Sequence, residues 1–440
     1  MLFSYSLMYK YAAKVVKINE KRKKLRFISY FCAMFFNEAT EEFIRANADG
    51  DVRKLALQGT KDAEVGLTQA LQQIAGRQMA RKKLPTWAAV DGIVYPPHLN
   101  MEQCSSEQTA RYKAKLAKCQ GSNCKLFVDL TGGFGIDFYW MSQAFQERIY
   151  VEQNPELCTI AEHNLRLLGL ASTVVNGTAA DYLSQLDHAS VIFLDPARRN
   201  EHGGRTYGIE DCTPNVLELL PMLLGKSDTV ILKLSPMLDW RKAVSDLRYV
   251  REVHIVSLDN ECKELIIQMK KETQGGVRLV CVNLLSNGEK QVFESFEGQS
   301  PNTNHISPLS PSPLLPSLFL YEPNASIMKA GCFAALAERY AVRQVANSSH
   351  LFLSTEEIDG FPGRKFRVLA VSPADRKKLC EVLVKSGLPI ERANMSVRNF
   401  PMTPEQLRKK LKLKDGGDTY IFATTSAQKG HLLLVCRKIS

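Results

Sequence analysis

Apolar runs of strand length alternate with helix-length stretches across the middle of the chain. Seven runs follow one another from residue 126: LFVDL, RIYVE, TVVNG, SVIFLDP, TVILKLSP, EVHIVSL and ELIIQMK. Apolar strands that alternate with helices are typical of a doubly wound α/β sheet. Only DNECK separates the last two runs, so we expect them to form an antiparallel hairpin at the edge of this sheet.

Helical periodicity dominates before the sheet, over 34–118. VGLTQALQQIAGRQMARKKL repeats its apolar positions at helical spacing, and CSSEQTARYKAKLAK resumes as a helix after a break. Ser105 and Gln108 have the spacing of a capping box at the start of that second helix. The first 33 residues place their charges within and after an apolar part, which is the wrong order for a secretory signal. We expect 1–33 to be a non-native or disordered leader and translation to begin at Met34.

A second folded region is expected after the sheet. Two short β runs, VRLVCVNLL and KQVFESF, precede a segment rich in Ser and Pro. Strand and helix patterns then alternate to the end of the chain. We therefore expect a helical domain over 34–118, the α/β domain over 119–275, a small β element with a linker over 276–320 and a small α+β domain over 321–440.

The net charge of +11 is unevenly distributed. Residues 361–440 carry 17 Lys and Arg against six Asp and Glu, and 1–33 carry eight against one, which leaves −7 for the middle. A basic end on an acidic body suggests a polyanionic partner, although a solvated charged face would have the same composition.

The cysteines and the hydropathy bear on compartment and cofactors. The eleven cysteines form no CxxC pair and no zinc-like spacing with His, and no apolar run reaches the length of a membrane span. We therefore expect no metal ion and no membrane partner. An odd cysteine count without an export signal favours the cytoplasm.

The segment VDLTGGFGID turns from a strand into a glycine-rich loop. Glycines allow backbone N–H groups to approach a nucleotide-type cofactor closely. A P-loop would need GxxxxGK[ST], and a dinucleotide fingerprint would need a third glycine where Phe138 stands. An acid in the strand followed by a short glycine turn, here Asp129 with Gly132, Gly133 and Gly135, is instead the methyltransferase form.

Residues after the next two strands complete this candidate cofactor site. Glu152 ends the next strand, about one βαβ unit after Asp129, where a carboxylate can accept hydrogen bonds from both ribose hydroxyls. Asp129 and the turn that includes Thr131 would lie near the methionine part of S-adenosylmethionine. NGTAADYL follows the third strand, and its Thr178 and Asp181 are candidates for the adenine side.

The helix predicted by CSSEQTARYKAKLAK lies directly before the glycine turn in the sequence. Its Glu107, Tyr112 and Lys113 are candidates to cover the cofactor. The alternative is that this helix simply packs.

The fourth strand ends in VIFLDPARRN, and catalytic groups of α/β sheets gather at the carboxyl ends of strands. Asp195, Pro196, Ala197 and Arg198 form a short polar-Pro-x-x segment there, which we take as the catalytic tetrad. The Asp195 carboxylate and the Ala197 carbonyl can accept hydrogen bonds from a planar amine and align its nitrogen with a methyl donor. The alternative is that Asp195 only caps a turn.

From about residue 37 the chain resembles a bacterial family of class I S-adenosylmethionine methyltransferases with a C-terminal THUMP-like domain. The resemblance is carried by EQCSSEQTARYKAKL, DLTGGFGID, DPARR, LSPMLD, YEPNASIMKAG, FPGRKFRV and VRNFPMTPEQLRKKLKLKDGGDTYIFAT. It implies a Rossmann-like sheet, S-adenosylmethionine as cofactor, a small ferredoxin-like middle element and structured RNA, such as tRNA or rRNA, as partner.

The tetrad departs from the DPPR of related enzymes at Ala197. The fifth strand ends in LKLSPMLDW, which has no Cys. Covalent attack on uracil C5 needs a thiolate, so N-methylation of a base is the expected chemistry.

Residues near the C-terminus are suited to an RNA partner. SVRNFPM places Arg398 beside Phe400, and LRKKLKLK places Arg408, Lys409 and Lys412 around a helix. Lys and Arg neutralise phosphates, and a ring can stack on an unpaired base. The competing explanation is a core phenylalanine and solvated lysines.

Two other classes of function stay open. One is a methyltransferase that acts on a protein or a small molecule, in which the basic end is incidental. The other is a non-catalytic RNA-binding protein with a relic cofactor fold, and the intact glycine turn with its acids argues against it.

Overall fold

The computed structural model describes residues 35–118, 124–198, 208–271, 275–297, 318–346, 348–388, 390–426 and 430–439. The leader expected over 1–33 lies outside them. The chain forms two compact units, one of 1–197 with 213–231 and the other of 198–212 with 232–440. No helix in the described ranges is long and apolar enough to cross a membrane.

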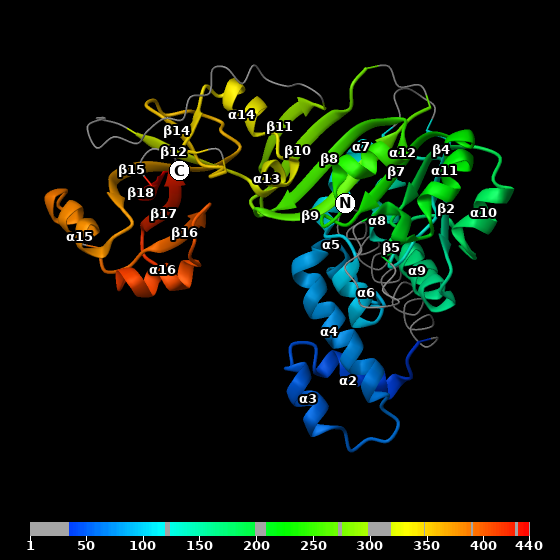
Figure 1. The fold of residues 1–440 in the computed structure, drawn as a ribbon. Coiled ribbons are helices and arrows are strands. Elements are labelled where there is room, and N and C mark those ends of the chain that lie inside the picture. Colours follow the sequence, from blue (N-terminus) through cyan, green and yellow to red (C-terminus); the bar gives the residue numbers. More distant parts are fainter. Residues whose placement is uncertain are drawn as a thin grey trace, which may run out of the picture. The chain divides into compact units, whose positions relative to one another are not determined.

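Helices form the first part of the first unit, as the periodicity predicts (Figure 1). They are α2 Glu38–Ala46, α3 Val52–Gln58, α4 Leu67–Lys83, α5 Pro85–Ala88, α6 His98–Gln103 and α7 Glu107–Leu116. The N-cap of α7 is Ser106, whose hydroxyl accepts the Thr109 N–H. The predicted box of Ser105 and Gln108 is therefore wrong by one residue. The Ser105 hydroxyl instead donates to the Asp137 carboxylate at 2.7 Å, a partner 32 positions away in the chain.

Nine strands of the described chain form one mixed sheet, in the order β11-β10-β8-β9-β7-β4-β1-β2-β3. They are β1 Leu126–Asp129, β2 Glu147–Glu152, β3 Thr173–Asn176, β4 Ala189–Leu194, β7 Ser227–Leu234, β8 Val250–Leu258, β9 Glu261–Met269, β10 Arg278–Leu284 and β11 Lys290–Phe296. β1 pairs in parallel with β2 and β4, and β2 with β3. Every position of β4 is buried, as expected for a strand covered on both faces. The predicted α/β sheet is confirmed.

The helices that follow these strands are α8 Ile136–Met141, α9 Pro155–Leu167, α10 Ala179–Gln185, α11 Val216–Gly225 and α12 Trp240–Leu247. The short elements β5 Ala197–Arg198, η1 Ile209–Asp211 and β6 Cys212–Thr213 lie between β4 and α11.

The hairpin of β8 and β9 is antiparallel, as predicted. It does not lie at the sheet edge, because β10 pairs in parallel with β8 and β11 pairs with β10. The two short β runs that we expected to form a separate element thus extend the same sheet. The apolar pattern of these two runs predicts strands, but it does not predict which strand each of them pairs with.

A second sheet, of seven strands among the described residues, has the order β13-β14-β12-β15-β18-β17-β16. Its strands are β12 Phe319–Pro323, β13 Arg343–Gln344, β14 Phe352–Ser354, β15 Gly363–Pro373, β16 Asn394–Arg398, β17 Thr419–Ser426 and β18 Gly430–Ile439. The accompanying helices are α13 Ala325–Ala330, α14 Phe333–Arg339, α15 Arg376–Lys385 and α16 Pro404–Leu411. The predicted C-terminal α+β region is confirmed.

Alternating side chains of β17 pack on the two faces of this second sheet. Ile421 and Ala423 join Leu379 of α15 and Leu407 of α16 in one buried cluster. Phe422, between them in sequence, lies in a different cluster on the other side of the strand. This period of two follows from strand geometry, which sends successive side chains to opposite faces.

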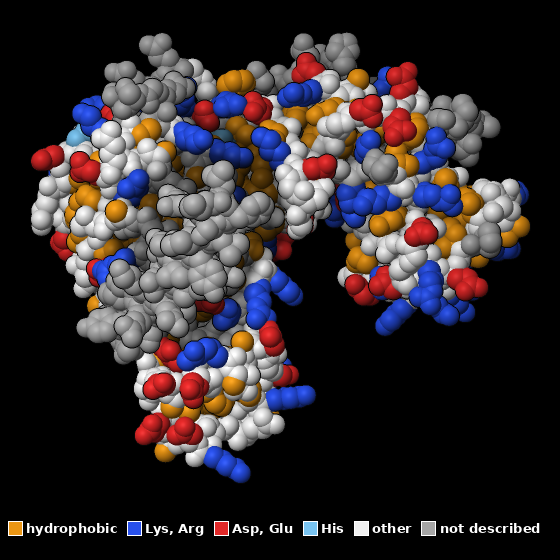
Figure 2. Space-filling view, turned by 180° about the vertical axis from the view of Figure 1, so that it is seen from behind, with side chains coloured by type: hydrophobic (Ala, Val, Ile, Leu, Met, Phe, Trp, Pro, Cys, Tyr) orange, Lys and Arg blue, Asp and Glu red, His pale blue; other side chains and the backbone are white. Residues whose placement is uncertain are grey.

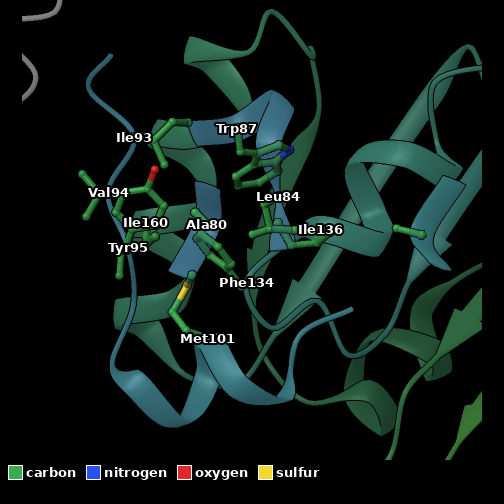
Figure 3. Packing of buried hydrophobic residues seen from close by; sticks show 11 residues of the cluster. Ala80, Leu84, Trp87, Ile93, Val94, Tyr95, Met101, Phe134, Ile136 and Ile160 are labelled. Carbon is green, nitrogen blue, oxygen red and sulfur yellow. The ribbon is translucent and has the colours of Figure 1, made fainter. Parts of the chain in front are cut away.

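The helices of the first unit pack against the glycine turn (Figure 3). Trp87 of α5 meets Phe134 edge to face, with ring centroids 5.1 Å apart. Leu84 and Ile136 belong to the same buried cluster. Burying large apolar side chains contributes roughly 1.5–3 kcal/mol each, so these contacts fix the turn from the side of the helices.

Candidate active site

The glycine turn follows β1 and leads directly into α8. The Gly135 N–H donates to the Gly132 carbonyl at 2.9 Å, which closes the turn. Gly133 and Gly135 have φ values of 55° and 85°, in the left-handed region that side chains disfavour. Gly132 has no room for a side chain, because a Cβ there would lie 2.1 Å from the Tyr150 ring. All three glycines are therefore required by local geometry.

Asp129, Thr131 and Asp195 join the carboxyl ends of two neighbouring strands, β1 and β4. The buried Asp129 carboxylate accepts the Thr131 N–H at 2.9 Å. The Thr131 hydroxyl oxygen in turn accepts the Asp195 N–H at 2.6 Å. The start of the predicted catalytic segment is thus tied to the predicted cofactor turn.

Carboxylates are concentrated around this junction. Burial raises the pKa of Asp129 well above its usual range, and the negative charges of Asp137, Asp195 and Glu152 raise it further. These neighbours come from α8 and from the ends of β4 and β2. Such a site favours a cationic ligand. Within the described ranges, no set of three or more His, Cys, Asp or Glu side chains is arranged to hold a metal ion.

Glu152 supports the turn directly. One of its carboxylate oxygens accepts the Gly133 N–H and the other accepts the Asn154 N–H, both at 2.9 Å. A carboxylate oxygen has two acceptor sites, so each retains capacity for another donor.

Thr178 and Asp181 lie at the start of α10, after β3. The Thr178 hydroxyl accepts the Asp181 N–H at 3.2 Å and donates to its carboxylate at 2.6 Å. The two residues thus cap the helix, and Asp181 is exposed. These contacts account for both side chains without a ligand.

The predicted tetrad spans the end of β4 and the short strand β5. Pro196 is buried and Ala197 is exposed. The side chain of Arg198 lies outside what the structure describes.

Sequence reasoning did not find a buried ion pair between Lys113 of α7 and Asp137 of α8. Lys113 has no exposed side-chain surface, and its ammonium lies 3.1 Å from the Asp137 carboxylate and 3.0 Å from the Ser105 hydroxyl. Glu107 accepts hydrogen bonds from the Thr86 N–H and hydroxyl at 2.8 and 2.6 Å. Neither Lys113 nor Glu107 is available to cover a cofactor, as one interpretation of the sequence suggested. A buried lysine cannot be told from a solvated one by spacing alone.

The C-terminal residues predicted to contact RNA fall into two groups. Arg398 donates to the buried Glu322 carboxylate at 2.7 Å, and Arg408 pairs with Asp415 at 2.8 Å. Phe400 is partly buried and contacts the His431 ring. Only the second group, Lys409 and Lys412, is fully at the surface.

Basic side chains gather at the end of the C-terminal sheet that carries α16 (Figures 1 and 2). The last turn of α16 contributes Arg408, Lys409 and Lys410. Cations at a helix C-terminus are favoured by the helix dipole, so these charges stabilise α16 whether or not they also bind a ligand.

Two family models match the C-terminal region. Residues 363–438 match a THUMP domain-like family, and residues 319–362 match a ferredoxin-like domain. The ferredoxin-like match lies after β10 and β11.

Solved structures extend the similarity over the rest of the chain. A candidate methyltransferase from Porphyromonas gingivalis W83 is 30% identical, with a TM-score of 0.79 over 92% of this chain and 100% of that one. A candidate class I S-adenosylmethionine-dependent methyltransferase from Listeria monocytogenes is 12% identical, with a TM-score of 0.36 over 56% of this chain and 93% of that one. A candidate RNA methyltransferase from Pyrococcus horikoshii is 15% identical, with a TM-score of 0.33 over 44% and 99%. The last two are too distant to support an argument, and no curated protein matches the chain.

Proposed function

Because this chain belongs to the family of class I S-adenosylmethionine methyltransferase-like proteins with ferredoxin-like and THUMP-like C-terminal domains, we propose that it N-methylates a base in structured RNA. The RNA is tRNA or rRNA, and the reaction takes place in the cytoplasm. The observation that best supports this proposal is the hydrogen bond from the Asp195 N–H to Thr131, which joins the candidate catalytic segment to the glycine turn.

The residues of the turn fit S-adenosylmethionine. A Cβ at Gly133 would meet nothing closer than the Thr131 carbonyl oxygen at 3.9 Å, which leaves the backbone open to a donor there. The surrounding carboxylates suit the positive charges of the donor's sulfonium and ammonium groups. When bound, the donor supplies an activated methyl group. Asp129 and Thr131 would contact its methionine part.

Glu152 would bind the ribose through its free acceptor sites. Thr178 and Asp181 remain our candidates for the adenine side. Their mutual hydrogen bonds position the N-terminus of α10, whose backbone could then border the base.

Asp195 and the Ala197 carbonyl would accept hydrogen bonds from the amine of the target base. That arrangement fixes the nitrogen lone pair toward the methyl group, and alignment is most of what a methyl transfer requires. Pro196, which is buried, restricts the backbone between them. Arg198 would contact a phosphate of the RNA.

The THUMP-like match and the basic cluster support the choice of RNA over other substrates. Lys409 and Lys412 would contact phosphates, together with Arg408. Phe400 and Arg398 would contribute a ring and a further cation at the neighbouring edge of the sheet.

The proposal is tested by transfer of radioactive methyl from S-adenosylmethionine into total RNA of a strain that lacks this gene. We expect label in one size class of RNA. D195A should lower incorporation at least about a hundredfold, because a misplaced reacting atom costs that much. The matched control is D187A, at an exposed position of the same unit, which should retain incorporation.

Three outcomes would contradict the proposal in different ways. Label in protein or small molecules instead of RNA would assign a different substrate class. Equal incorporation by D195A and the wild type would remove Asp195 from the chemistry. No incorporation, with no binding of the donor by calorimetry, would indicate a non-catalytic RNA-binding protein.

A further inference from the structure

Lys113 is a lysine near the glycine turn whose side chain is fully buried. Its side chain has no exposed surface, and the Asp137 side chain that it pairs with is 11% exposed. Ser105 links the two side chains, since its hydroxyl donates to Asp137 and accepts from Lys113. Replacing a buried ion pair with apolar residues is often neutral or stabilising, so stability alone gives little reason for an ion pair at this position.

The carboxylate partner of Lys113 lies next to the candidate donor site. Asp137 is two residues after Gly135, in the first turn of α8. The Tyr139 N–H donates to the Gly135 carbonyl at 2.9 Å, so the glycine turn and this helix are continuous. Asp137 is also close enough to Asp129 for its charge to act on that carboxyl. We therefore expect a displacement of Asp137 to displace the glycine turn as well.

The opposite end of α7 is fixed to the N-terminal helices. Glu107 accepts from both the N–H and the hydroxyl of Thr86, on α5, and pairs with Arg111. Ser105, just before α7, and Lys113, in its last turn, both contact Asp137 of α8. This gives Lys113 a defined position relative to the turn.

We propose that Lys113 is a positioning residue of the donor site, which holds the first turn of α8, and with it the glycine turn, in the geometry that binds S-adenosylmethionine. Its ammonium also compensates one of the carboxylates that approach the donor site, namely Asp137 of α8. The other three are Asp129, Asp195 and Glu152. The inference rests on the proposed function, because it concerns the binding of the same donor.

The test measures the dissociation constant of S-adenosylmethionine by calorimetry, on the full chain, at pH 6, 7 and 8. K113M replaces the lysine with an uncharged side chain of similar volume. The Asp137 carboxylate then lacks the neighbouring Lys113 ammonium. At pH 8 we expect about tenfold weaker binding or worse. The loss of a neighbouring cation favours the protonated form of a buried carboxyl, and lowering the pH favours it further, so the deficit relative to the wild type should shrink toward pH 6. The matched control is K115M, at an exposed position of the same helix, which should bind like the wild type.

The double variant K113M/D137N separates positioning from packing. It removes both charges of the pair, so it should recover most of the lost affinity at pH 8 and show no pH-dependent deficit. A role in packing alone would give a deficit that is the same at every pH and is not relieved by D137N. The double variant also keeps the test decisive if K113M alone does not fold.

The results distinguish this inference from the proposed function. Equal affinities of the wild type and K113M at all three pH values would overturn the role of Lys113 only. Absence of donor binding by the wild type would overturn the proposed function, and this inference with it.

Discussion

Gly132 is the residue at which the glycine turn comes closest to its surroundings. A Cβ there would lie 2.1 Å from the Tyr150 ring, which is fully buried and whose hydroxyl donates to the Gly133 carbonyl. The ring cannot move without breaking that hydrogen bond. We expect G132A to lower the free energy of unfolding by about 1–3 kcal/mol, as overpacking does, and to abolish donor binding.

Urea unfolding and calorimetry with S-adenosylmethionine check this prediction. The control is G225A, because no atom lies within 4 Å of a Cβ at Gly225, which ends a helix at an exposed position. G225A should be neutral or slightly stabilising. A stable G132A variant that binds the donor would show that the turn tolerates a side chain.

Asp129 is a residue at which stability and function oppose each other. Burial, and then the charges of Asp137, Asp195 and Glu152, raise its pKa in the folded protein. The stability that its protonated form provides is therefore complete at low pH and is lost as the pH rises through the raised pKa. At pH 8 the Asp129 carboxyl ionises freely in the unfolded chain. In the folded chain, burial and the neighbouring negative charges oppose its ionisation. The free energy of unfolding falls by about 1.4 kcal/mol for each tenfold difference in proton affinity between the two states.

D129N should therefore be more stable than the wild type at pH 8, with an advantage that shrinks toward pH 5. Its amide oxygen can still accept the Thr131 N–H, but the lost charge should weaken donor binding. Urea unfolding at several pH values measures the difference. The exposed D187N is the control, and an advantage of D129N that does not depend on pH would exclude ionisation as its cause.

At the scale of elements, Glu322 joins three strands of the C-terminal sheet. From β12 it accepts hydrogen bonds from Arg364 of β15 and Arg398 of β16. Its side chain is only 3% exposed, whereas those of the two arginines are 38% and 35% exposed. Water around the arginines screens part of the interaction. The buried carboxylate thus adds to the pairing of β12 with β15, which joins the ferredoxin-like and THUMP-like segments.

E322Q keeps the shape of this side chain and removes its charge. We expect it to lower the free energy of unfolding by about 1–3 kcal/mol, less than for a fully buried pair. E357Q is the matched control, because Glu357 is 47% exposed and lies 3.8 Å from Lys365. If the two variants lose the same small amount in urea unfolding, the Glu322 contacts do not stabilise the sheet.

The sequence predicts individual strands and helices better than it predicts which of them lie next to one another. β4 could be predicted because each of its residues is buried, and its last four residues form the apolar run VIFL. The place of the β8–β9 hairpin could not, since β10 comes from a later segment. Contacts between distant residues were missed for the same reason. Ser105 binds Asp137 rather than capping its own helix, and Arg398 pairs with Glu322, 76 positions away.

Across the whole molecule, acidic and basic groups are concentrated in different regions. The candidate donor site is rich in carboxylates, whereas residues 361–440 carry an excess of 11 positive charges. An RNA that binds Lys and Arg releases counterions, so its affinity falls steeply with salt. S-adenosylmethionine is small and its binding releases few ions.

For the intact protein, we expect the donor affinity to change by less than about twofold between 50 and 300 mM KCl. The affinity for RNA should fall at least about tenfold over the same range, since several phosphate contacts are lost. K409A/K410A removes two exposed cations of α16 and should reduce the slope of log affinity against log salt by about 1–2, with the donor affinity unchanged. K54A/K61A, at exposed positions of the first unit, removes the same charge and should leave the slope unaltered. Equal losses in the two double variants would mean that RNA responds to net charge alone, and the basic end of α16 would then have only its helix-capping role.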